Sequence, residues 1–367
     1  MPKTGTTSVQ ETLAFGMRDP AFEYCGFGLV NGSAPLGELL GLERHLVEQR
    51  RLRLGIGNRD PRRHLQRRLE RSIRRAQSRG ATLVLSAETG YGWSRESHQK
   101  LFQILAPFGL QLKALVYVRP PLDWLASSIG EGIKFGVLAN QQAIERVFEP
   151  SALQRRMAIA ERLEMLAATY GAQRLVVRPF LRDALHQGCV VQDLAQQLGI
   201  QITSQQVRRR NDSLPLNGSR ALHIRNQTQG RTLRGPLDLM RRDALISRLS
   251  RVFQGESSLR LAPTLLGSSE PFVQDQVQRL RRCFGLELPL SVGAGRAADE
   301  PPLANLQSLL ELPEAARLKL AGACGVPGNP PIALLLEQLE QRWDGGFVGQ
   351  QLQRRLRRHW HHAWRAV

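Results

Sequence analysis

The first ten residues, MPKTGTTSVQ, combine side chains that could bind an anion. Gly5 permits a tight turn of the backbone, and a helix that begins near Ser8 would leave its first N–H groups unpaired. Lys3 adds a mobile positive charge. Together these groups predict a cradle for a phosphate-sized anion, reinforced by the helix dipole. A simple helix cap would account for Thr7 or Ser8, but not for the lysine and the glycine beside them.

A second anion-binding stretch is predicted at residues 116–129, VYVRPPLDWLASSI. It has the pattern of a strand that ends at Arg119, a turn marked by two prolines, and a new helix that carries Ser127. An arginine fork together with a hydroxyl suits a phosphate dianion, because each contact is charge-assisted. The alternative is structural: Arg119 would pair with Asp123, and Ser127 would be an ordinary serine on a helix face.

Glu88 is the candidate for proton transfer. It follows the apolar run TLVLSA at residues 82–87, so it lies just past the end of a predicted strand. Open α/β sheets bind their ligands at the carboxyl ends of the strands, where a carboxylate can accept a proton from a substrate hydroxyl. The alternative is a salt bridge between Glu88 and one of the many arginines of the chain.

Alternating strand and helix patterns predict an α/β fold with a doubly wound parallel sheet. Apolar runs at residues 82–87, 112–118 and 174–177 have the composition of strands that are covered on both faces. Helical spacing at residues 96–109 and 141–170 indicates βαβ crossovers between these strands.

The predicted domain boundaries divide the chain into three parts. We expect an α/β domain at residues 1–290 that is mainly helical after about residue 205, a linker at 291–301, and a basic helical C-terminal appendage at 302–367. The tail contains His359, His361 and His362. Because no acidic or cysteine ligand is nearby, they predict an exposed or dimer-packing helix rather than a metal site. The sequence does not define the oligomeric state.

The composition is strongly basic. The 367 residues include 51 lysines and arginines against 32 acids, a net charge of +19, which favours binding to polyanions, anionic lipid or acidic small molecules. Residues 61–79 predict a basic amphipathic helix that is either a solvated surface helix or the lining of a groove for an acidic substrate.

The four cysteines lie far apart, and neither a membrane-spanning run nor a signal peptide is present, so we expect a cytoplasmic protein.

Three of these stretches resemble the sulfotransferases that use 3′-phosphoadenosine 5′-phosphosulfate (PAPS). The order Lys, Thr, Gly, Thr, Thr resembles the 5′-phosphosulfate loop of that family, and the separation of Arg119 from Ser127 is that of its 3′-phosphate motif. The sequence SAE that ends at Glu88 is similar to the glutamate motif of bacterial and glycan-directed members. The resemblance covers residues 1 to about 290 and includes a weaker downstream stretch, in which Arg178 is either structural or functional.

The resemblance implies a P-loop-like phosphosulfate-binding loop and transfer of a sulfuryl group from PAPS to a hydroxyl of a carbohydrate, on a polysaccharide or a glycolipid. It implies that Lys3 and Glu88 are catalytic and that no metal is required. The residues that it implies for binding PAPS are Lys3, Thr4, Gly5, Thr6, Thr7, Ser8, Arg119 and Ser127. Besides the carbohydrate acceptor, the basic helices could contact an acidic polymer or a membrane surface.

In the family a hydrophobic strand precedes the loop, whereas this sequence starts at the last residue of such a strand. We therefore expect the translation start to lie upstream of Met1; the alternative is a protein without its central strand.

Two other functions stay open. One is a basic nucleic-acid or membrane-surface binding protein with a vestigial loop, and the other is an atypical small-molecule kinase. The kinase is disfavoured because the loop GxxxxGK[ST] places glycine directly before lysine, and here lysine comes first.

Overall fold

The protein divides into two compact units. The structure, a computed structural model, describes residues 1–16, 19–42, 60–208, 213–229, 236–292, 300–328 and 330–341. Unit 1 comprises Met1–Arg119, Ile159–Asn211 and Gln278–Leu288, and unit 2 comprises Pro120–Ala158, Asp212–Val277 and Pro289–Val367. This division differs from the predicted domain at residues 1–290, because unit 2 takes residues from both sides of that boundary. Most of the predicted linker and the tail with His359, His361 and His362 lie outside the described residues.

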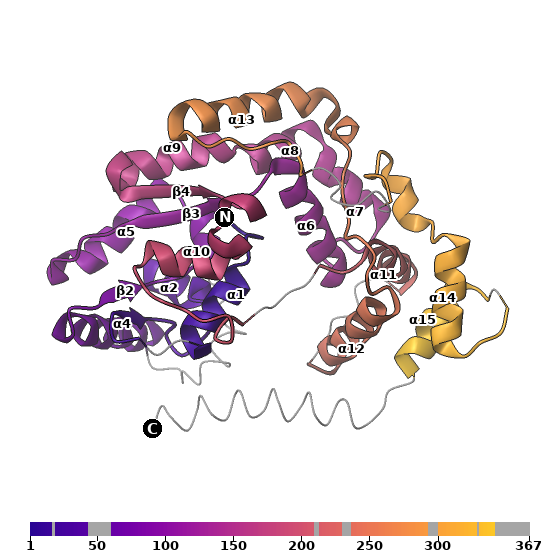
Figure 1. The fold of residues 1–367 in the computed structure, drawn as a ribbon, viewed down its shortest axis with the longest axis horizontal. Helices are drawn as coiled ribbons and strands as arrows, with labels where there is room; N and C mark the ends of the chain where they lie inside the picture. The colour runs from indigo at the N-terminus through magenta and orange to yellow at the C-terminus, as the bar shows by residue number, and fades with distance from the viewer. Residues whose placement is uncertain are drawn as a thin grey trace. The chain divides into compact units, whose positions relative to one another are not determined.

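Most of the described residues are helical (Figure 1). The elements of unit 1 are α1 (Thr6–Glu11), β1 (Phe22–Tyr24), α2 (Ser33–Leu40), α4 (Pro61–Ser78), β2 (Thr82–Val84), α5 (Arg95–Leu105), β3 (Ala114–Val118), α9 (Ile159–Tyr170), β4 (Leu175–Pro179) and α10 (Val190–Gln197). Those of unit 2 are α6 (Pro121–Lys134), α7 (Gln141–Glu145), α8 (Pro150–Met157), α11 (Leu216–Gln229), α12 (Pro236–Val252), α14 (Glu314–Cys324) and α15 (Ile332–Gln341). Helix α13 (Glu270–Phe284) contributes residues to both units.

The strands form two parallel pairs, β1 with β2 and β3 with β4. Phe22 lies opposite Thr82 in the first pair, and Ala114 lies opposite Leu175 in the second. Strands β2, β3 and β4 fall on the three predicted apolar runs, whereas β1 was not predicted. The protein is therefore mixed α/β, with small parallel sheets among many helices.

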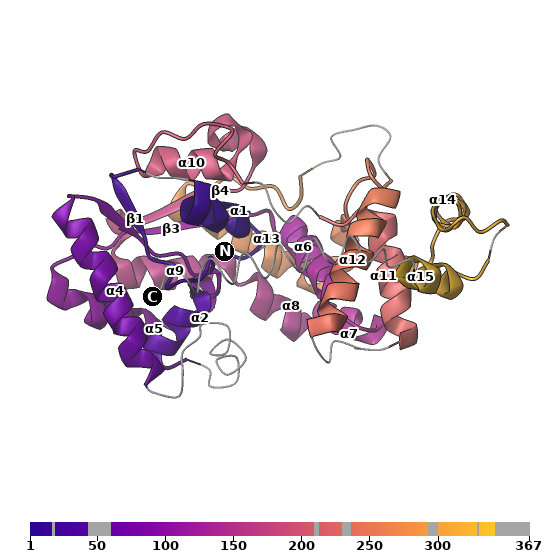
Figure 2. The ribbon, with the colours of Figure 1, turned by 90° about the horizontal axis from the view of Figure 1, so that it is seen from below.

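Helices of unit 1 cover both faces of these strands (Figure 2). Val84 and Tyr117 pack in one cluster with Val9 of α1 and Val191 of α10. Leu83, the neighbour of Val84 in β2, packs instead with the buried side chains of α4 and α5. Successive side chains of a strand point to opposite faces, so this alternation explains why strand residues on both faces are apolar. The cluster around α1 and α10 receives side chains from both strand pairs.

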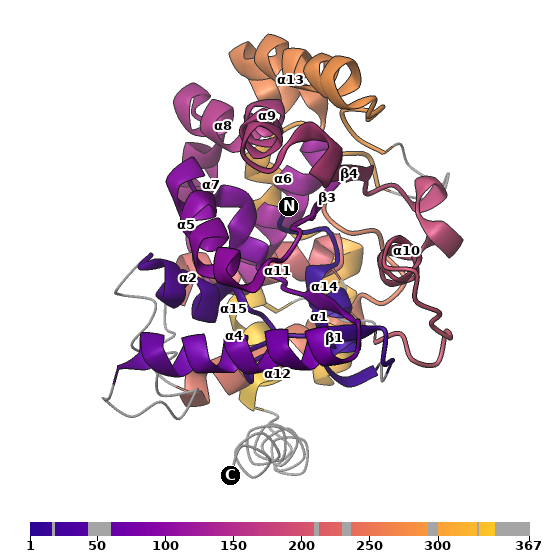
Figure 3. The same cartoon turned by 90° about the vertical axis from the view of Figure 1, so that its left-hand side faces the viewer.

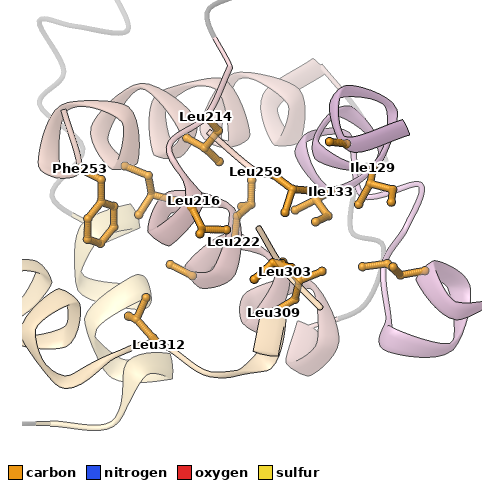
Figure 4. Packing of buried hydrophobic residues seen from close by; sticks show 14 of the residues in the cluster. Ile129, Ile133, Leu214, Leu216, Leu222, Phe253, Leu259, Leu303, Leu309 and Leu312 are labelled. Atoms are coloured by element: carbon orange, nitrogen blue, oxygen red, sulfur yellow. The ribbon is translucent and has the colours of Figure 1, made fainter. Parts of the chain in front are cut away.

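Unit 2 is built around one large apolar core. Ile129 and Ile133 of α6 and Leu222 of α11 lie in this core, which also contains Phe253 and Leu309 (Figure 4). The leucines of α14 and α15 that belong to the same cluster are Leu320, Leu335, Leu336 and Leu339. The described part of the predicted C-terminal appendage is thus not a separate body, because its leucines are buried in the core of unit 2.

A histidine is buried in unit 2 beside this core. His223 is fully buried, and its Nε2 lies 3.3 Å from the Oε1 atom of Gln141. Among the described residues its Nδ1 has no hydrogen-bond partner. Burial lowers the pKa of His223 from 6.5 to about 4, since the protein interior disfavours the charged imidazolium. The imidazole is therefore neutral in the folded protein near neutral pH.

We predict that His223 makes unit 2 less stable in mild acid. The unfolded chain binds more protons than the folded one between pH 6.5 and about 4, so the free energy of unfolding falls as the pH is lowered through this window. Linkage gives a loss of about 2 kcal/mol between pH 7 and pH 5. Denaturant titrations of the wild type and of His223→Gln at both pH values measure it. The pH dependence should persist in His186→Gln, whose side chain is exposed; an unchanged dependence in His223→Gln would contradict the prediction.

No helix among the described residues has the length and apolarity that crossing a bilayer requires. All four cysteines, which lie in the described part of the chain, are free thiols.

Candidate functional site

The N-terminal residues lie against β3 in unit 1, at the position marked N in Figure 1. The amino group of Met1 is buried and donates a hydrogen bond of 2.9 Å to the carbonyl oxygen of Tyr117. The next carbonyl of β3, that of Val118, accepts from the N–H of Phe180 after β4. Because successive carbonyls of a strand point to opposite edges, Met1 occupies the edge of β3 away from β4.

The turn after Met1 has two residues in the left-handed region. Lys3 has a φ of 64° and Gly5 a φ of 71°. A lysine pays for this conformation in steric strain, whereas glycine adopts it freely. The hydroxyl of Thr4 donates to the Met1 carbonyl at 2.6 Å and so closes the turn. Gly5 then caps α1, where a left-handed residue followed by helical ones directs backbone N–H groups toward a common point.

Gly5 is also a point of close approach. A β-carbon at this position would lie 2.8 Å from Cγ1 of Val190, at the start of α10. The side chain of Val190 is branched and buried, so it has little room to move. The sequence thus needs glycine here for two reasons, the positive φ and the contact with α10.

We expect Gly5→Ala to destabilise unit 1 by about 1–3 kcal/mol, as the sum of backbone strain and steric overlap. Denaturant unfolding measures this loss. Gly109→Ala is the matched control, because Gly109 has a φ of 64° but nothing within 4 Å of an added β-carbon. It carries the backbone penalty alone, so equal losses in the two variants would contradict the proposed overlap with Val190.

Arg119 lies beside the turn. Its Nη1 donates to the carbonyl oxygen of Lys3 at 3.2 Å, and its backbone N–H approaches the sulfur of Met1 at 3.5 Å. The guanidinium also stacks over the ring of Phe180, 5.7 Å from the ring centre. The structure therefore brings together two of the predicted anion-binding residues, Lys3 and Arg119, although 116 positions separate them in the chain.

Glu88 begins a 3-10 turn at Glu88–Gly92 and is half-buried. Burial lowers the pKa of the Met1 amino group to about 5, while the negative charge of Glu88 raises it. The segment that carries Glu88 lies against α1, because the hydroxyl of Ser86, two residues earlier, accepts a hydrogen bond from Gln10. Within the described part of the chain Glu88 makes no ion pair, so the alternative of an arginine salt bridge is not supported there.

Several hydrogen bonds fix the segment that carries Glu88. The side-chain amide of Gln10, which is buried in α1, donates to the Ser86 hydroxyl at 3.0 Å. The N–H of Gly32 donates to the Ser86 carbonyl at 3.0 Å, and the N–H of Thr89 donates to the Ser33 hydroxyl at 3.2 Å. The candidate base is therefore held on both sides, by α1 and by the start of α2.

The other predicted site residues differ in their burial and in their hydrogen-bond partners. Thr6, Thr7 and Ser8 form the first turn of α1 and are half-buried. Thr4 is buried, and its hydroxyl donates to the carbonyl of Met1 within the turn. Its side chain therefore has a structural partner, and the predicted binding of PAPS by Thr4 would involve its backbone. Ser127 lies on α6 in unit 2, and its predicted pairing with Arg119 stays a prediction. Asp123, the alternative partner of Arg119, accepts hydrogen bonds from Ser291 and from the N–H of Val292.

The sequence analysis did not identify Asp193, which supports the N-terminal turn through Tyr117. Asp193 of α10 is completely buried and accepts two hydrogen bonds from Arg178, at 2.8 and 2.7 Å. Tyr117 donates its hydroxyl to the same carboxylate at 2.8 Å, and the N–H of His186 donates at 3.0 Å. Burial alone would raise the pKa of Asp193, but these hydrogen bonds and the Arg178 charge hold it below the usual value. Arg178, whose role the sequence left open, therefore has a structural partner in Asp193.

The described residues contain no group of three or more histidine, cysteine, aspartate or glutamate side chains that could hold a metal ion. Comparison of the chain with models of protein families, with curated proteins and with solved structures finds no match.

Proposed function

We propose that the protein is a PAPS-dependent sulfotransferase that acts on a hydroxyl of a carbohydrate. The observation that carries this proposal is the contact between Arg119 and the backbone of Lys3, together with the hydrogen bond from Gln10 to Ser86 that holds the segment of Glu88 against α1. Two cations at a left-handed turn offer binding groups for the phosphates of one nucleotide. A carboxylate beside them can accept a proton from the hydroxyl that attacks.

The proposed reaction follows from these roles. Backbone N–H groups at Gly5 and the first turn of α1 hold the 5′-phosphosulfate, and Arg119 holds the 3′-phosphate. The acceptor oxygen forms a bond to sulfur as the bond from sulfur to the bridging oxygen breaks. The electron pair of that bond stays on the phosphate, where Lys3 neutralises it. The proton of the acceptor hydroxyl passes to Glu88, and adenosine 3′,5′-bisphosphate leaves.

We also propose that the two strand pairs belong to one doubly wound parallel sheet with the phosphosulfate loop at its carboxyl edge. Support comes from the single cluster against α1 and α10 that receives Val84 from one pair and Tyr117 from the other. A further support is the hydrogen bond that the Met1 amino group donates to the Tyr117 carbonyl, because it places the N-terminal residues at the edge of β3 away from β4. In such sheets ligands bind where the strand order reverses, outside the carboxyl ends of the strands.

The experiment is a turnover assay of the full chain with PAPS and a panel of polysaccharides, in which the release of adenosine 3′,5′-bisphosphate is measured. We expect release that depends on the acceptor and that a metal chelator does not abolish. Turnover of ATP with magnesium, in place of PAPS, would instead favour the kinase. Salt-dependent binding of RNA without turnover of PAPS would favour the nucleic-acid binding alternative.

A further inference from the structure

Helix α4 of unit 1 carries a row of arginines along one face. Arg63, Arg67, Arg71 and Arg74 follow one another at intervals of four, four and three residues, and all four are exposed. Residues at these intervals share one face of an α-helix. We call this row the arginine stripe. At a rise of about 1.5 Å per residue it extends over about 16 Å. Figure 3 shows α4 along its length, with β1 beside it.

The opposite face of α4 fixes the direction of the stripe. Leu65, Leu69 and Ile73 are at most 1% exposed and belong to the core cluster that α4 shares with α2 and α5. At about 100° per residue the stripe lies on the far side of the helix from these three side chains. The core therefore holds α4 in place, and the four guanidinium groups point into the solvent.

The charge of the stripe exceeds that of the neighbouring acids, which are Asp60, whose carboxylate caps α4 by accepting from the backbone N–H of Arg63, and Glu70, which accepts from Gln66. Helix α4 contains seven arginines and one glutamate, which gives it a charge of +6 from these residues (seven minus one). Glu23 of β1 is paired with Arg75 and Arg79, which lie outside the stripe. Among the residues that the structure describes, no carboxylate pairs with any of the four stripe arginines.

The arginines of α4 also act on one another. Burial lowers the pKa of His64 and, beyond burial, the positive charges of Arg68, Arg67 and Arg71 lower it further. Like charges four residues apart repel, and two of the stripe's neighbouring pairs have this spacing. Cations in the first helical turn, such as Arg63, also oppose the helix dipole. Folding thus concentrates positive charge on a rigid surface at a cost that a bound polyanion would relieve.

We propose that the arginine stripe is a docking surface for an anionic polysaccharide. The choice of a carbohydrate among polyanions rests on the proposed function, and the stripe would then hold the acceptor polymer. Guanidinium groups form paired hydrogen bonds with carboxylates and sulfates, which are the charged groups of such polymers. A row of four groups over several helical turns matches an extended chain with repeated charges better than a single small anion.

Two other polyanions fit the surface less well. A helix that lies in a membrane inserts an apolar face, but the apolar face of α4 is buried in the core and α4 has no exposed large apolar side chain. Surfaces that bind single-stranded nucleic acids interleave aromatic side chains with the cations so that bases can stack. The sequence of α4, PRRHLQRRLERSIRRAQS, contains no phenylalanine, tyrosine or tryptophan.

The test compares two variants of the full chain that lose the same charge. The stripe variant carries Arg63→Gln, Arg67→Gln, Arg71→Gln and Arg74→Gln, since glutamine also favours helices. The matched control removes four exposed cations of unit 1 that lie outside α4: Arg95→Gln, Lys100→Gln, Lys113→Gln and Arg174→Gln. Binding to fluorescent heparin, to a duplex DNA and to phosphatidylserine vesicles is measured over a salt series, with uncharged dextran as the blank. Circular dichroism verifies the fold of each variant.

We expect the stripe variant to bind heparin at least about tenfold more weakly than the wild type, with a shallower dependence on salt. The control should change by about twofold or less. Equal losses in the two variants would overturn the proposal, because they would reflect net charge alone. A stripe-dependent loss for DNA or vesicles but not for heparin would overturn it as well. Calorimetry with adenosine 3′,5′-bisphosphate separates the two proposals, since the stripe variant should bind this nucleotide like the wild type.

Discussion

Replacing Glu88 with glutamine is expected to slow the proposed sulfuryl transfer by about 10²- to 10⁴-fold, the usual contribution of a positioned general base. Glutamine keeps the size of the side chain, and the hydrogen bonds that fix this segment come from Ser86 and Thr89, not from Glu88. The variant should therefore fold normally and still bind the donor. Single-turnover rates with saturating PAPS measure the loss at the chemical step.

The control for this variant is Glu96→Gln, which removes an exposed carboxylate from the start of α5 in the same unit. Its rate should stay within about twofold of the wild type, because the residue is a surface helix residue. A Glu88→Gln variant that retained the wild-type rate would remove Glu88 from the mechanism. An equal loss in both variants would point to a general effect of charge.

Replacing Asp193 with alanine is expected to destabilise unit 1 by about 3 kcal/mol, the lower end of the cost of removing one partner of a buried ion pair, because the Arg178 side chain is 27% exposed. The change leaves the guanidinium of Arg178 without its counter-charge and the hydroxyl of Tyr117 without its acceptor. Because Tyr117 also holds the amino group of Met1 through its carbonyl, the loss should extend to the N-terminal turn. Urea unfolding measures the stability, and hydrogen exchange of the α10 and β3 amides locates the effect.

The matched control is Asp183→Ala, which removes an exposed carboxylate ten positions earlier in the same segment. We expect a change of at most about 0.5 kcal/mol there. The wild type should also lose the contribution of Asp193 in acid. The pKa of Asp193 is lowered in the folded protein, so its stabilisation is present above the unfolded pKa and is lost as the pH falls through the folded one. A loss below about 1 kcal/mol in Asp193→Ala would contradict this role.

The apolar runs predicted three of the four strands that the described residues form, because burial on both faces leaves a signature in composition. Strand β1 escaped prediction, since FEY is only three residues long and includes a charged residue. Its place comes from pairing with β2, which no local pattern encodes. The helical stretch at residues 141–170 was predicted as a unit, but the helix restarts at Pro150, and Ala158, with a ψ of 57°, separates α8 from α9.

The division into units could not be predicted from local sequence. Leucines such as Leu320 and Leu335 fit an amphipathic helix in any setting, and their burial with α6 and α11 depends on contacts far along the chain. Composition at the predicted linker suggested a boundary, yet the main chain of Leu303 just after it donates to the carbonyl of Arg260. Small residues and prolines indicate irregular backbone, and they do not show whether the flanking segments pack together.

The candidate site was partly predictable. The sequence placed Glu88 and Arg119 just after apolar strands, and β2 and β3 do end shortly before them. The direct contact of Arg119 with the Lys3 carbonyl depends on the turn at the N-terminus, which no local pattern encodes. The Asp193 support had one visible signal, a charged residue within the buried run Val190–Ala195. A buried aspartate requires a partner, but the sequence did not identify Arg178 as that partner.

The most direct test of the account is a calorimetric titration of adenosine 3′,5′-bisphosphate into the wild type, Lys3→Ala and Arg119→Ala. Lys100→Ala, an exposed lysine of α5, serves as the control. We predict binding by the wild type with a Kd of about 1 μM, weakened at least about tenfold in each site variant and unchanged in the control. A wild type that does not bind the nucleotide, or binding that is indifferent to both site substitutions, would contradict the claim that Lys3 and Arg119 hold one doubly phosphorylated nucleotide.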